Sequence, residues 1–431
     1  MTRYMPLVLL IALVAAAGCG DSVPRITITE VVDAENGKAT VKYLAEEFSS
    51  NNIDITAHYT GNGLIMAAAT SGGGDGVAGL TTTGSGVEHS FVWDYKTDLG
   101  IGRHRNLAFS VVPYGPDGRG RTGVVGPLSV GLPKLFTANA NVDSVSVVDI
   151  GGGLVSSTIT VGDKPGGMAA MSDESLLFVS NYNDGTVSHI DIANPTTINT
   201  LVVGTSPAKV LASPDALWIY VVNEGDGTVS VIDTSGTPSV VDTYAVGTTP
   251  SGMSLTESGD TLFVANSGDN TVSILQSIDG TPFISPITVG TTPLGIATSS
   301  RYTVVCNSGS GTVSIIDNGA IASGPPEVAV DSEPVAVVID KLSAFAYVAN
   351  HGSESISVVN LDAKIVVQTI DLGSTGVNLP KDLVLDSTGT HLYVVYDVSS
   401  KVARIDVSSL TVLSTITVGS MPVGVVILPS E

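Results

Sequence analysis

The stretch IYVVNEGDGTVSVID, residues 219–233, recurs with variations seven times in the C-terminal two-thirds of the chain. Each copy has an apolar run, an asparagine, a turn rich in Gly, Asp and Ser, and a second β-branched run. The other copies are LFTANANVDSVSVVD from residue 135, LFVSNYNDGTVSHID from 177, LFVANSGDNTVSILQ from 262, TVVCNSGSGTVSIID from 303, AYVANHGSESISVVN from 346 and LYVVYDVSSKVARID from 392. The asparagine (tyrosine in the last copy) falls at 139, 181, 223, 266, 307, 350 and 396. A period in the forties, made of short strands and tight turns, predicts a β-propeller with one blade per copy.

A second repeated element lies between the copies and shows how the ring closes. Each linker reads Val-Gly-x-x-Pro or a variant of it, with proline at 165, 207, 250, 293, 334, 380 and 422, and an apolar run follows. The hairpins and the proline-led runs are out of phase, since the first hairpin begins at Lys134 and the last proline-led run ends the chain. We therefore predict an all-β fold with a closed ring of seven blades over residues 133–431. In this ring the C-terminal strand completes blade 1 and leaves no exposed inner edge.

The asparagine and glycine of each hairpin are expected to shape its turn. Glycine supplies the positive φ that such turns require, and asparagine or aspartate side chains can bond their own backbone. Under this interpretation the repeated asparagine is not a binding motif, and function must lie where the copies differ.

Composition and charge limit the class of protein. Apolar residues make up 43% of the 431 residues and charged residues only 14%, which excludes a disordered chain. The net charge is −23, and residues 131–431 alone contain 9 basic and 29 acidic residues. A domain this negative would repel phosphate backbones, so we expect no nucleic-acid partner.

The N-terminus carries the features of an export signal. Arg3 precedes an apolar run that is too short to span a membrane, and residues 1–18 are predicted to be a signal peptide. Residues 15–19, AAAGC, resemble a bacterial lipobox; an ordinary signal peptide with an incidental cysteine is the alternative. The resemblance implies acyl chains, such as palmitate, on Cys19 at the head of a tether over residues 19–24. More than one chain gives stable anchoring. Gly20, where an aspartate often signals inner-membrane retention, favours the outer membrane of a Gram-negative cell, on its periplasmic side or at the surface.

Residues 25–130 lack the repeat and are predicted to form a separate domain. Strand-like runs at 26–31, 39–44, 53–59, 64–70, 87–93, 107–112 and 123–130 alternate with turn signals. Seven short strands with such spacing predict an antiparallel sandwich. Their order and spacing resemble a fibronectin type III-like or immunoglobulin-like module.

The hairpins resemble a known repeat family. Residues 220–223 (YVVN), 263–266 (FVAN) and 347–350 (YVAN), together with the Val-Gly-x-x-Pro linkers, resemble the YVTN family of β-propeller repeats. The resemblance implies a propeller over about 300 residues. Relatives include surface-layer and extracytoplasmic proteins, and the wider fold hosts lactonases and haem- or quinone-linked enzymes. Repeat identity implies an architecture rather than a chemistry.

The sequence shows no catalytic constellation, and we predict no cofactor. The histidines of the propeller, His189, His351 and His391, fall in three different blades. No haem-attachment, nucleophile-elbow or HExxH motif occurs in the chain. Cys306, left after Cys19 as the second cysteine, is expected to be a small buried core residue.

A candidate binding face follows from the positions at which the copies differ. Two residues after the proline of each blade the residue is glycine or alanine, except at Lys209 and Asp382, which could mark an asymmetric site at the channel mouth. The hairpin turns add further charged residues. The candidate face comprises Lys209, Asp382, Asp184, Asp226, Asp269 and His351. One or two carboxylates per loop fall short of a dedicated Ca²⁺ cage, although a bound Ca²⁺ is left open.

These observations favour a membrane-anchored, extracytoplasmic binding or scaffold protein. Its propeller would present a rigid face to a protein or glycan partner, without enzymatic activity. The alternative is a periplasmic lactonase-like propeller hydrolase that holds a divalent metal at the channel mouth.

Overall fold

The computed structural model describes most of the chain as strands and turns. The described residues are 25–34, 38–46, 54–61, 64–67, 70–74, 87–93, 103–115, 118–119, 123–131, 134–150, 152–192, 194–276, 282–321, 324–373 and 379–428. Cys19, the expected signal peptide and the tether lie outside these residues. Within the described part there is no helix of the length and apolarity needed to cross a membrane.

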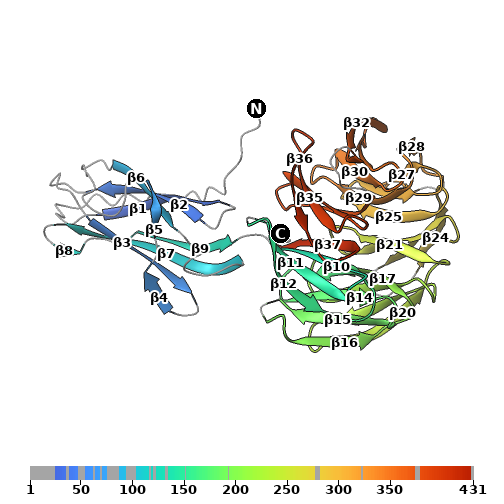
Figure 1. Cartoon of the computed structure of the whole chain (residues 1–431), viewed down its shortest axis with the longest axis horizontal. Coiled ribbons are helices and arrows are strands. Elements are labelled where there is room, and N and C mark those ends of the chain that lie inside the picture. The colour runs from blue at the N-terminus through green and yellow to red at the C-terminus, as the bar shows by residue number, and fades with distance from the viewer. Residues whose placement is uncertain are drawn as a thin grey trace. The chain divides into compact units, whose positions relative to one another are not determined.

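The chain divides into two compact units, residues 1–133 with 150–152, and residues 134–149 with 153–431. The first unit contains two antiparallel sheets (Figure 1), with strand orders β1-β2-β6-β5 and β4-β3-β7-β8, and β9 also pairs with β7. Their bounds are β1 Arg25–Ala34, β2 Lys38–Glu46, β3 Asp54–Gly61, β4 Leu64–Ala67, β5 Thr70–Gly74, β6 Val87–Trp93, β7 Arg103–Gly115, β8 Gly118–Arg119 and β9 Gly123–Gly131. Alternate residues of β2, Val41, Tyr43 and Ala45, are fully buried, as one face of a packed sheet requires.

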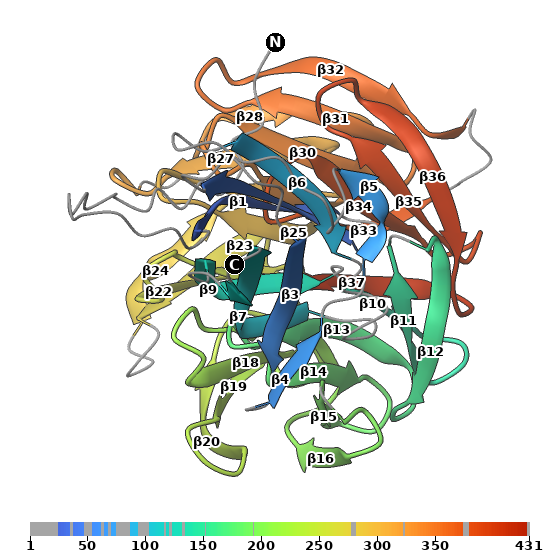
Figure 2. The ribbon, with the colours of Figure 1, turned by 90° about the vertical axis from the view of Figure 1, so that its left-hand side faces the viewer.

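The second unit is a ring of seven four-stranded antiparallel sheets, and Figure 2 shows the blades following one another with their outer strands at the rim. We call the strands of a blade a to d from the axis outward, and the segment from strand d to the next strand a the linker. Blade 1 is β37 Pro422–Leu428, β10 Lys134–Asn139, β11 Ser144–Asp149 and β12 Leu154–Thr160; blade 2 is β13 Pro165–Ala170, β14 Leu176–Asn181, β15 Thr186–Asp191 and β16 Ile198–Val202. Blade 3 is β17 Pro207–Ala212, β18 Trp218–Asn223, β19 Thr228–Asp233 and β20 Ser239–Ala245; blade 4 is β21 Pro250–Leu255, β22 Thr261–Asn266, β23 Thr271–Gln276 and β24 Pro282–Thr288. Blade 5 is β25 Pro293–Thr298, β26 Tyr302–Asn307, β27 Thr312–Asp317 and β28 Glu327–Ala329; blade 6 is β29 Pro334–Ile339, β30 Phe345–Asn350, β31 Ser355–Asn360 and β32 Ile365–Asp371; blade 7 is β33 Pro380–Leu385, β34 His391–Tyr396, β35 Lys401–Asp406 and β36 Thr411–Thr417.

The C-terminal strand closes the ring. Strand β37 pairs antiparallel with β10, with Lys134 opposite Leu428 and Ala138 opposite Gly424. It contacts β33 of blade 7 on one side and β13 of blade 2 on the other. The prediction of a seven-bladed, all-β propeller closed by the last strand is therefore confirmed.

The core of the ring consists of the interfaces between blades. In β18 the side chains of Ile219 and Val221 face blade 2, whereas those of Tyr220 and Val222 face blade 4. This alternation is the two-residue period of a strand buried on both faces, and it explains why the strand reads as an unbroken apolar run. Cys306 is fully buried in the same kind of interface, between blades 5 and 6, and burial raises the pKa of its thiol.

Candidate functional site

The repeated asparagine bonds across its own hairpin to strand c and to the linker, and not to the backbone of its own turn as predicted. The predicted positive φ of the hairpin glycine is present at Gly185, Gly227 and Gly311. In blade 3, Asn223 Nδ2 donates to Thr228 Oγ1 (3.0 Å) and Ser230 Oγ (2.8 Å) of strand c, and Oδ1 accepts the Gly204 N–H of the linker (3.1 Å). Donation to two strand c hydroxyls recurs for the fully buried asparagines 139, 181, 266, 307 and 350. The linker bond recurs in blades 2 and 4, and Oδ1 of Asn307 and of Asn350 has no partner. In blades 1 to 6 the buried asparagine therefore joins strands b and c of its own blade, and in blades 2 to 4 it also bonds to the linker from the preceding blade.

The close approach of the asparagine side chain explains why the linker has glycine. A Cβ added to Gly162 would lie 2.5 Å from Asn181 Cγ and 2.7 Å from its Nδ2, which no side chain could tolerate without displacing the asparagine. Where the linker has glycine, that glycine is therefore required by packing against the asparagine and carries no information on ligands. Blade 6 has Asp331 there, which accepts the Ser355 hydroxyl.

The three hairpin aspartates of the candidate face also bind hairpins to linkers; we call these hydrogen-bonded hairpins and linkers the frame of the propeller. Oδ2 of Asp184, Asp226 and Asp269 accepts the N–H of Asp163 (2.8 Å), Thr205 (2.6 Å) and Thr248 (2.6 Å), respectively. Ser310 and Ser353 occupy the same position in blades 5 and 6, and their hydroxyls accept the equivalent bonds. Backbone and side-chain hydrogen bonds from Thr205 lower the pKa of Asp226, and those from Thr248 lower that of Asp269. The structure places these aspartates in three successive blades; Asp184 and Asp226 line one hollow between blades 2 and 3, whereas Asp269 does not.

Two positions per blade vary freely on the same frame. One is the residue after the asparagine, and the other is the residue before the proline. The first donates its backbone N–H to the carbonyl of the second, as in Tyr182 N–H to Lys164 O (3.1 Å) and His351 N–H to Glu333 O (2.8 Å). We call these the display positions, and we call the end of the propeller formed by the hairpins and linkers the loop face. The residue before proline has positive φ in every blade: Lys164, Ser206, Thr249, Thr292, Glu333, Leu379 and Met421. The residues after the asparagine (Tyr396 in blade 7) are Ala140, Tyr182, Glu224, Ser267, Ser308, His351 and Asp397.

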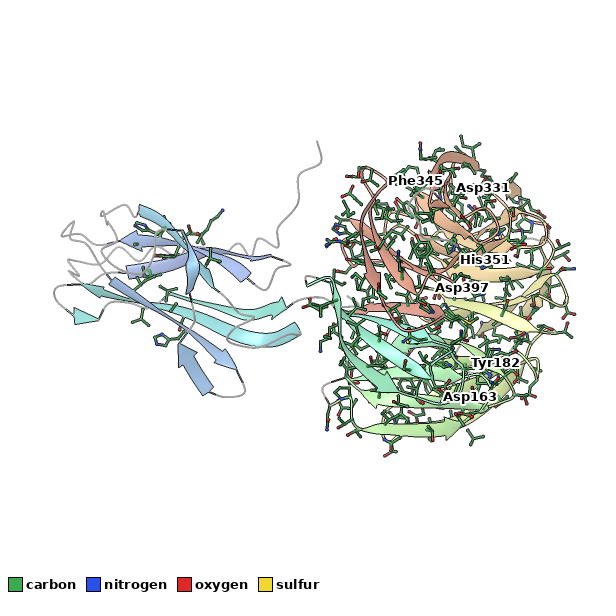
Figure 3. The ribbon with its side chains drawn as sticks, viewed as in Figure 1. Asp163, Tyr182, Asp331, Phe345, His351 and Asp397 are labelled. Carbon is green, nitrogen blue, oxygen red and sulfur yellow. The ribbon has the colours of Figure 1, made fainter. Side chains whose placement is uncertain are left out.

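His351 is held between two carboxylates at this face. Its Nδ1 lies 3.5 Å from Glu333 Oε2 of its own blade and its Nε2 lies 3.5 Å from Asp397 Oδ2 of blade 7 (Figure 3). In the sequence His351 is an isolated loop residue. In the structure it lies beside the display positions of its own blade and of blade 7. Among the described residues no group of three or more His, Cys, Asp or Glu side chains could hold a metal ion. The metal expected under the hydrolase alternative therefore has no fitting donor set there.

Lys209 and Asp382 meet across the axis of the ring. Lys209 Nζ of blade 3 lies 3.3 Å from Asp382 Oδ2 of blade 7, and the same oxygen accepts the Val425 N–H of the closing strand (3.3 Å). At the equivalent glycines of blades 1, 2, 4 and 5 there is no room for a side chain; a Cβ on Gly167, for example, would lie 2.6 Å from Ala208 O. Blade 6 has the small residue Ala336 there. The Asp382 side chain is 13% exposed and that of Lys209 is 37% exposed, so the carboxylate is largely covered whereas the lysine remains partly accessible.

The other two histidines of the propeller lie away from the loop face contacts of His351. His189 is buried beside the Phe178 ring, and burial lowers its pKa. His391 Nδ1 lies 2.8 Å from Asp386 Oδ2, and its Nε2 lies 2.9 Å from Arg404 Nη2. The Asp386–His391–Arg404 cluster was not foreseen: Asp386 lies in the loop between β33 and β34, and Arg404 reaches His391 only through the pairing of β34 with β35.

Comparisons with known proteins support the architecture. Residues 299–426, which run from β26 to β37, match the family model described as "Lactonase, 7-bladed beta-propeller". Among solved structures, a functionally unknown protein from Desulfotomaculum acetoxidans is similar at 16% identity, with 68% of this chain and 98% of that one covered and a TM-score of 0.61. A putative 6-phosphogluconolactonase from Bacteroides fragilis is similar at 13% identity (69% and 98% covered, TM-score 0.56), and hydrazine synthase from Kuenenia stuttgartiensis at 19% (66% and 92%, TM-score 0.55). No curated protein matches the chain. At these identities the likeness extends to the fold alone.

Proposed function

We propose that this protein is a lipid-anchored, extracytoplasmic binding protein whose propeller presents its loop face to a protein or glycan partner. The observation that carries the proposal is the division of labour on that face. The side chains of the asparagine and of the hairpin aspartate or serine, together with the linker glycine, hold the hairpins and linkers in place. The residues at the display positions, in contrast, differ from blade to blade. A rigid frame with variable side chains is the arrangement that recognition by repeat proteins requires.

The anchor is proposed from the sequence around Cys19 and the spacer from the first unit. The sheet orders β1-β2-β6 and β4-β3-β7-β9 support a fibronectin type III-like module between the anchor and the propeller. Acyl chains on Cys19 would hold the protein at the outer membrane. Labelled palmitate should appear in the wild type and be absent from Cys19→Ala; label retained by the variant would remove the anchor from the proposal.

Binding through the loop face is tested by capture from a detergent extract of the native envelope. The full chain is compared with a triple variant, Ser267→Arg, Ser308→Arg and His351→Arg, which fills display positions of three successive blades. The matched control places the same charges at the opposite end of the blades, as Leu342→Arg, Ser235→Arg and Thr388→Arg. We expect the first triple to lose a captured partner about tenfold or more and the control to retain it. Equal capture by both triples would place recognition elsewhere.

A lactonase-like hydrolase is the second candidate, favoured by the family match over residues 299–426. Lys209 and Asp382 are the charged groups that the axis offers to such chemistry. The test is hydrolysis of 6-phosphogluconolactone, the substrate class in the name of one structural neighbour, by the wild type and by Asp382→Asn. Turnover above the buffer rate that Asp382→Asn abolishes would favour the hydrolase; a rate equal to buffer would leave the binding protein.

A further inference from the structure

A hollow of about 550 Å³ opens on the loop face where blade 2 meets blade 3. One wall is the hairpin of blade 2, with Tyr182 and Asp184, and the other is the linker from Val202 to Ser206. Asp226, from the hairpin of blade 3, completes it. Because hairpin and linker are bonded through Gly185 O and the Val203 N–H (3.1 Å), the walls belong to the rigid frame.

Tyr182 makes this hairpin different from the other six. It is the only Phe, Tyr or Trp among the seven residues that follow the asparagine position, where the other blades have Ala, Glu, Ser, Ser, His and Asp. The Nζ of Lys164, the partner display residue, lies 4.4 Å from the centre of the Tyr182 ring. The ring of Tyr182 is thus already placed to interact with an ammonium group, and Figure 3 shows it in the same region as Asp163.

The walls of the hollow offer an apolar surface for the methylene stem of a long cationic side chain and carboxylates for its charge. Val202 is 79% exposed and offers an apolar surface for a methylene stem. Asp184 and Asp226 each use one oxygen to accept a backbone N–H, and that bond keeps the Asp226 carboxylate ionised by lowering its pKa. The surrounding propeller, with 29 acidic and 9 basic residues, draws a cation toward the site.

We infer that this hollow receives a lysine or arginine side chain of the partner protein, with its stem against Val202 and Tyr182 and its charge beside Asp184 and Asp226. The inference rests on the proposed binding function and names the chemistry of one contact. Lys164 does not line the hollow, but its positive charge already lies on the Tyr182 ring, so it competes with an incoming cation for that ring.

The test is titration of a fluorescein-labelled hexalysine peptide with the full chain, kept in solution by Cys19→Ser, in 0.15 M salt. Tyr182→Ala should weaken binding about fivefold or more, whereas Tyr182→Phe should retain it, because the ring and not the hydroxyl meets the cation. Asp226→Asn should weaken binding by a similar factor. The matched control is Asp269→Asn, which changes an equivalent aspartate that lines no part of the hollow and should leave the affinity unchanged.

Lys164→Met gives a result that a diffuse acidic surface would not. Removal of the internal competitor should tighten hexalysine binding several-fold, whereas Lys364→Met, which changes the net charge equally, should have a much smaller effect. No binding by the wild type, or equal affinities for Tyr182→Ala, Asp226→Asn and Asp269→Asn, would overturn the inference. If an envelope partner is still captured as well by Tyr182→Ala as by the wild type, the hollow fails and the binding function stands; if the wild type captures nothing, the binding function itself fails.

Discussion

Blades 1 to 6 and blade 7 solve the same packing problem with different chemistry. In the first six, a buried asparagine donates to a hydroxyl at the start of strand c and to a serine two residues further on. Blade 7 has Tyr396, Lys401 and Ala403 at the three positions. Blade 7 thus lacks all three members, and it contains no strand c hydroxyl at these positions that would be left without the asparagine as its donor. The comparison shows that the three residues form one unit of the repeat.

Blade 7 also contains most of the departures that sequence patterns flagged or missed. It carries Asp382 of the axial pair, the Asp386–His391–Arg404 cluster, and Asp397 beside His351. Tyr396 Oη, Asp397 Oδ1 and Ser399 Oγ are buried there without a hydrogen-bond partner. Blades 1 to 6 keep the frame, and blade 7 gives up part of it for charged and orphaned polar groups.

The largest expected effect comes from breaking the unit in a blade that has it complete. Asn223→Ala removes three hydrogen bonds and leaves Thr228, Ser230 and the Gly204 N–H without their partner. We expect a loss of about 2–4 kcal/mol in the free energy of unfolding, measured by denaturant titration. Asn183→Ala, which changes an exposed asparagine of a hairpin, is the control and should cost less than about 0.5 kcal/mol. Equal losses would contradict the special role of the buried position.

A smaller loss is expected at the axial pair of blade 7. Asp382→Ala removes the partner of Lys209 and the acceptor of the Val425 N–H, and so loosens the closing strand. A cost of about 1–2 kcal/mol is expected, since Lys209 is partly solvated and its charge is screened. Asp362→Ala, which removes the carboxylate of the exposed pair with Arg301, provides the surface comparison. Hydrogen exchange should quicken in β37 for Asp382→Ala only; protection unchanged in β37 would disprove the tie.

These two sites also separate the features that could be predicted from the sequence from those that could not. The period, the phase of the proline-led strands and the apolar runs were sufficient for seven blades and for closure by β37, because they depend on local pattern. The partner of Asn223 across the linker is 19 residues away, and Lys209 and Asp382 are 173 residues apart. Pattern breaks flagged both charged residues, but only the closed ring brings them together.

Blade 7 should respond in the opposite sense to the loss of a polar atom. Tyr396→Phe deletes a buried hydroxyl that has no partner, so we expect unchanged stability or a gain of up to about 1 kcal/mol. Tyr302→Phe, whose hydroxyl donates to Asp362 (2.9 Å), should lose stability by a similar amount. Thermal unfolding of the two variants side by side would settle the contrast, and a destabilised Tyr396→Phe would mean that its hydroxyl has a partner after all.

The smallest effect is a dependence on pH. Side-chain bonds from Ser408 and Ser409, and the Ser409 N–H, lower the pKa of Asp406 to about 2 in the folded protein, against 3.8 ordinarily. A carboxyl with a depressed pKa stabilises the fold above its unfolded value and loses that contribution as it becomes protonated. The stability difference between the wild type and Asp406→Asn should therefore be constant above about pH 5 and shrink between about pH 4 and pH 2. A difference that grows on acidification would reverse the assignment.

The pairing of β10 with β37 has a consequence for how the protein is made. Blade 1 receives three of its strands when the propeller begins and its inner strand only when the propeller ends. During synthesis the edge of β10 at Leu135 stays without its β37 partner until the residues of the other six blades have been made. Contacts this distant in sequence slow folding and expose strand edges meanwhile. Pairing of β37 with β10 is then the step that converts an open arc of blades into a closed ring.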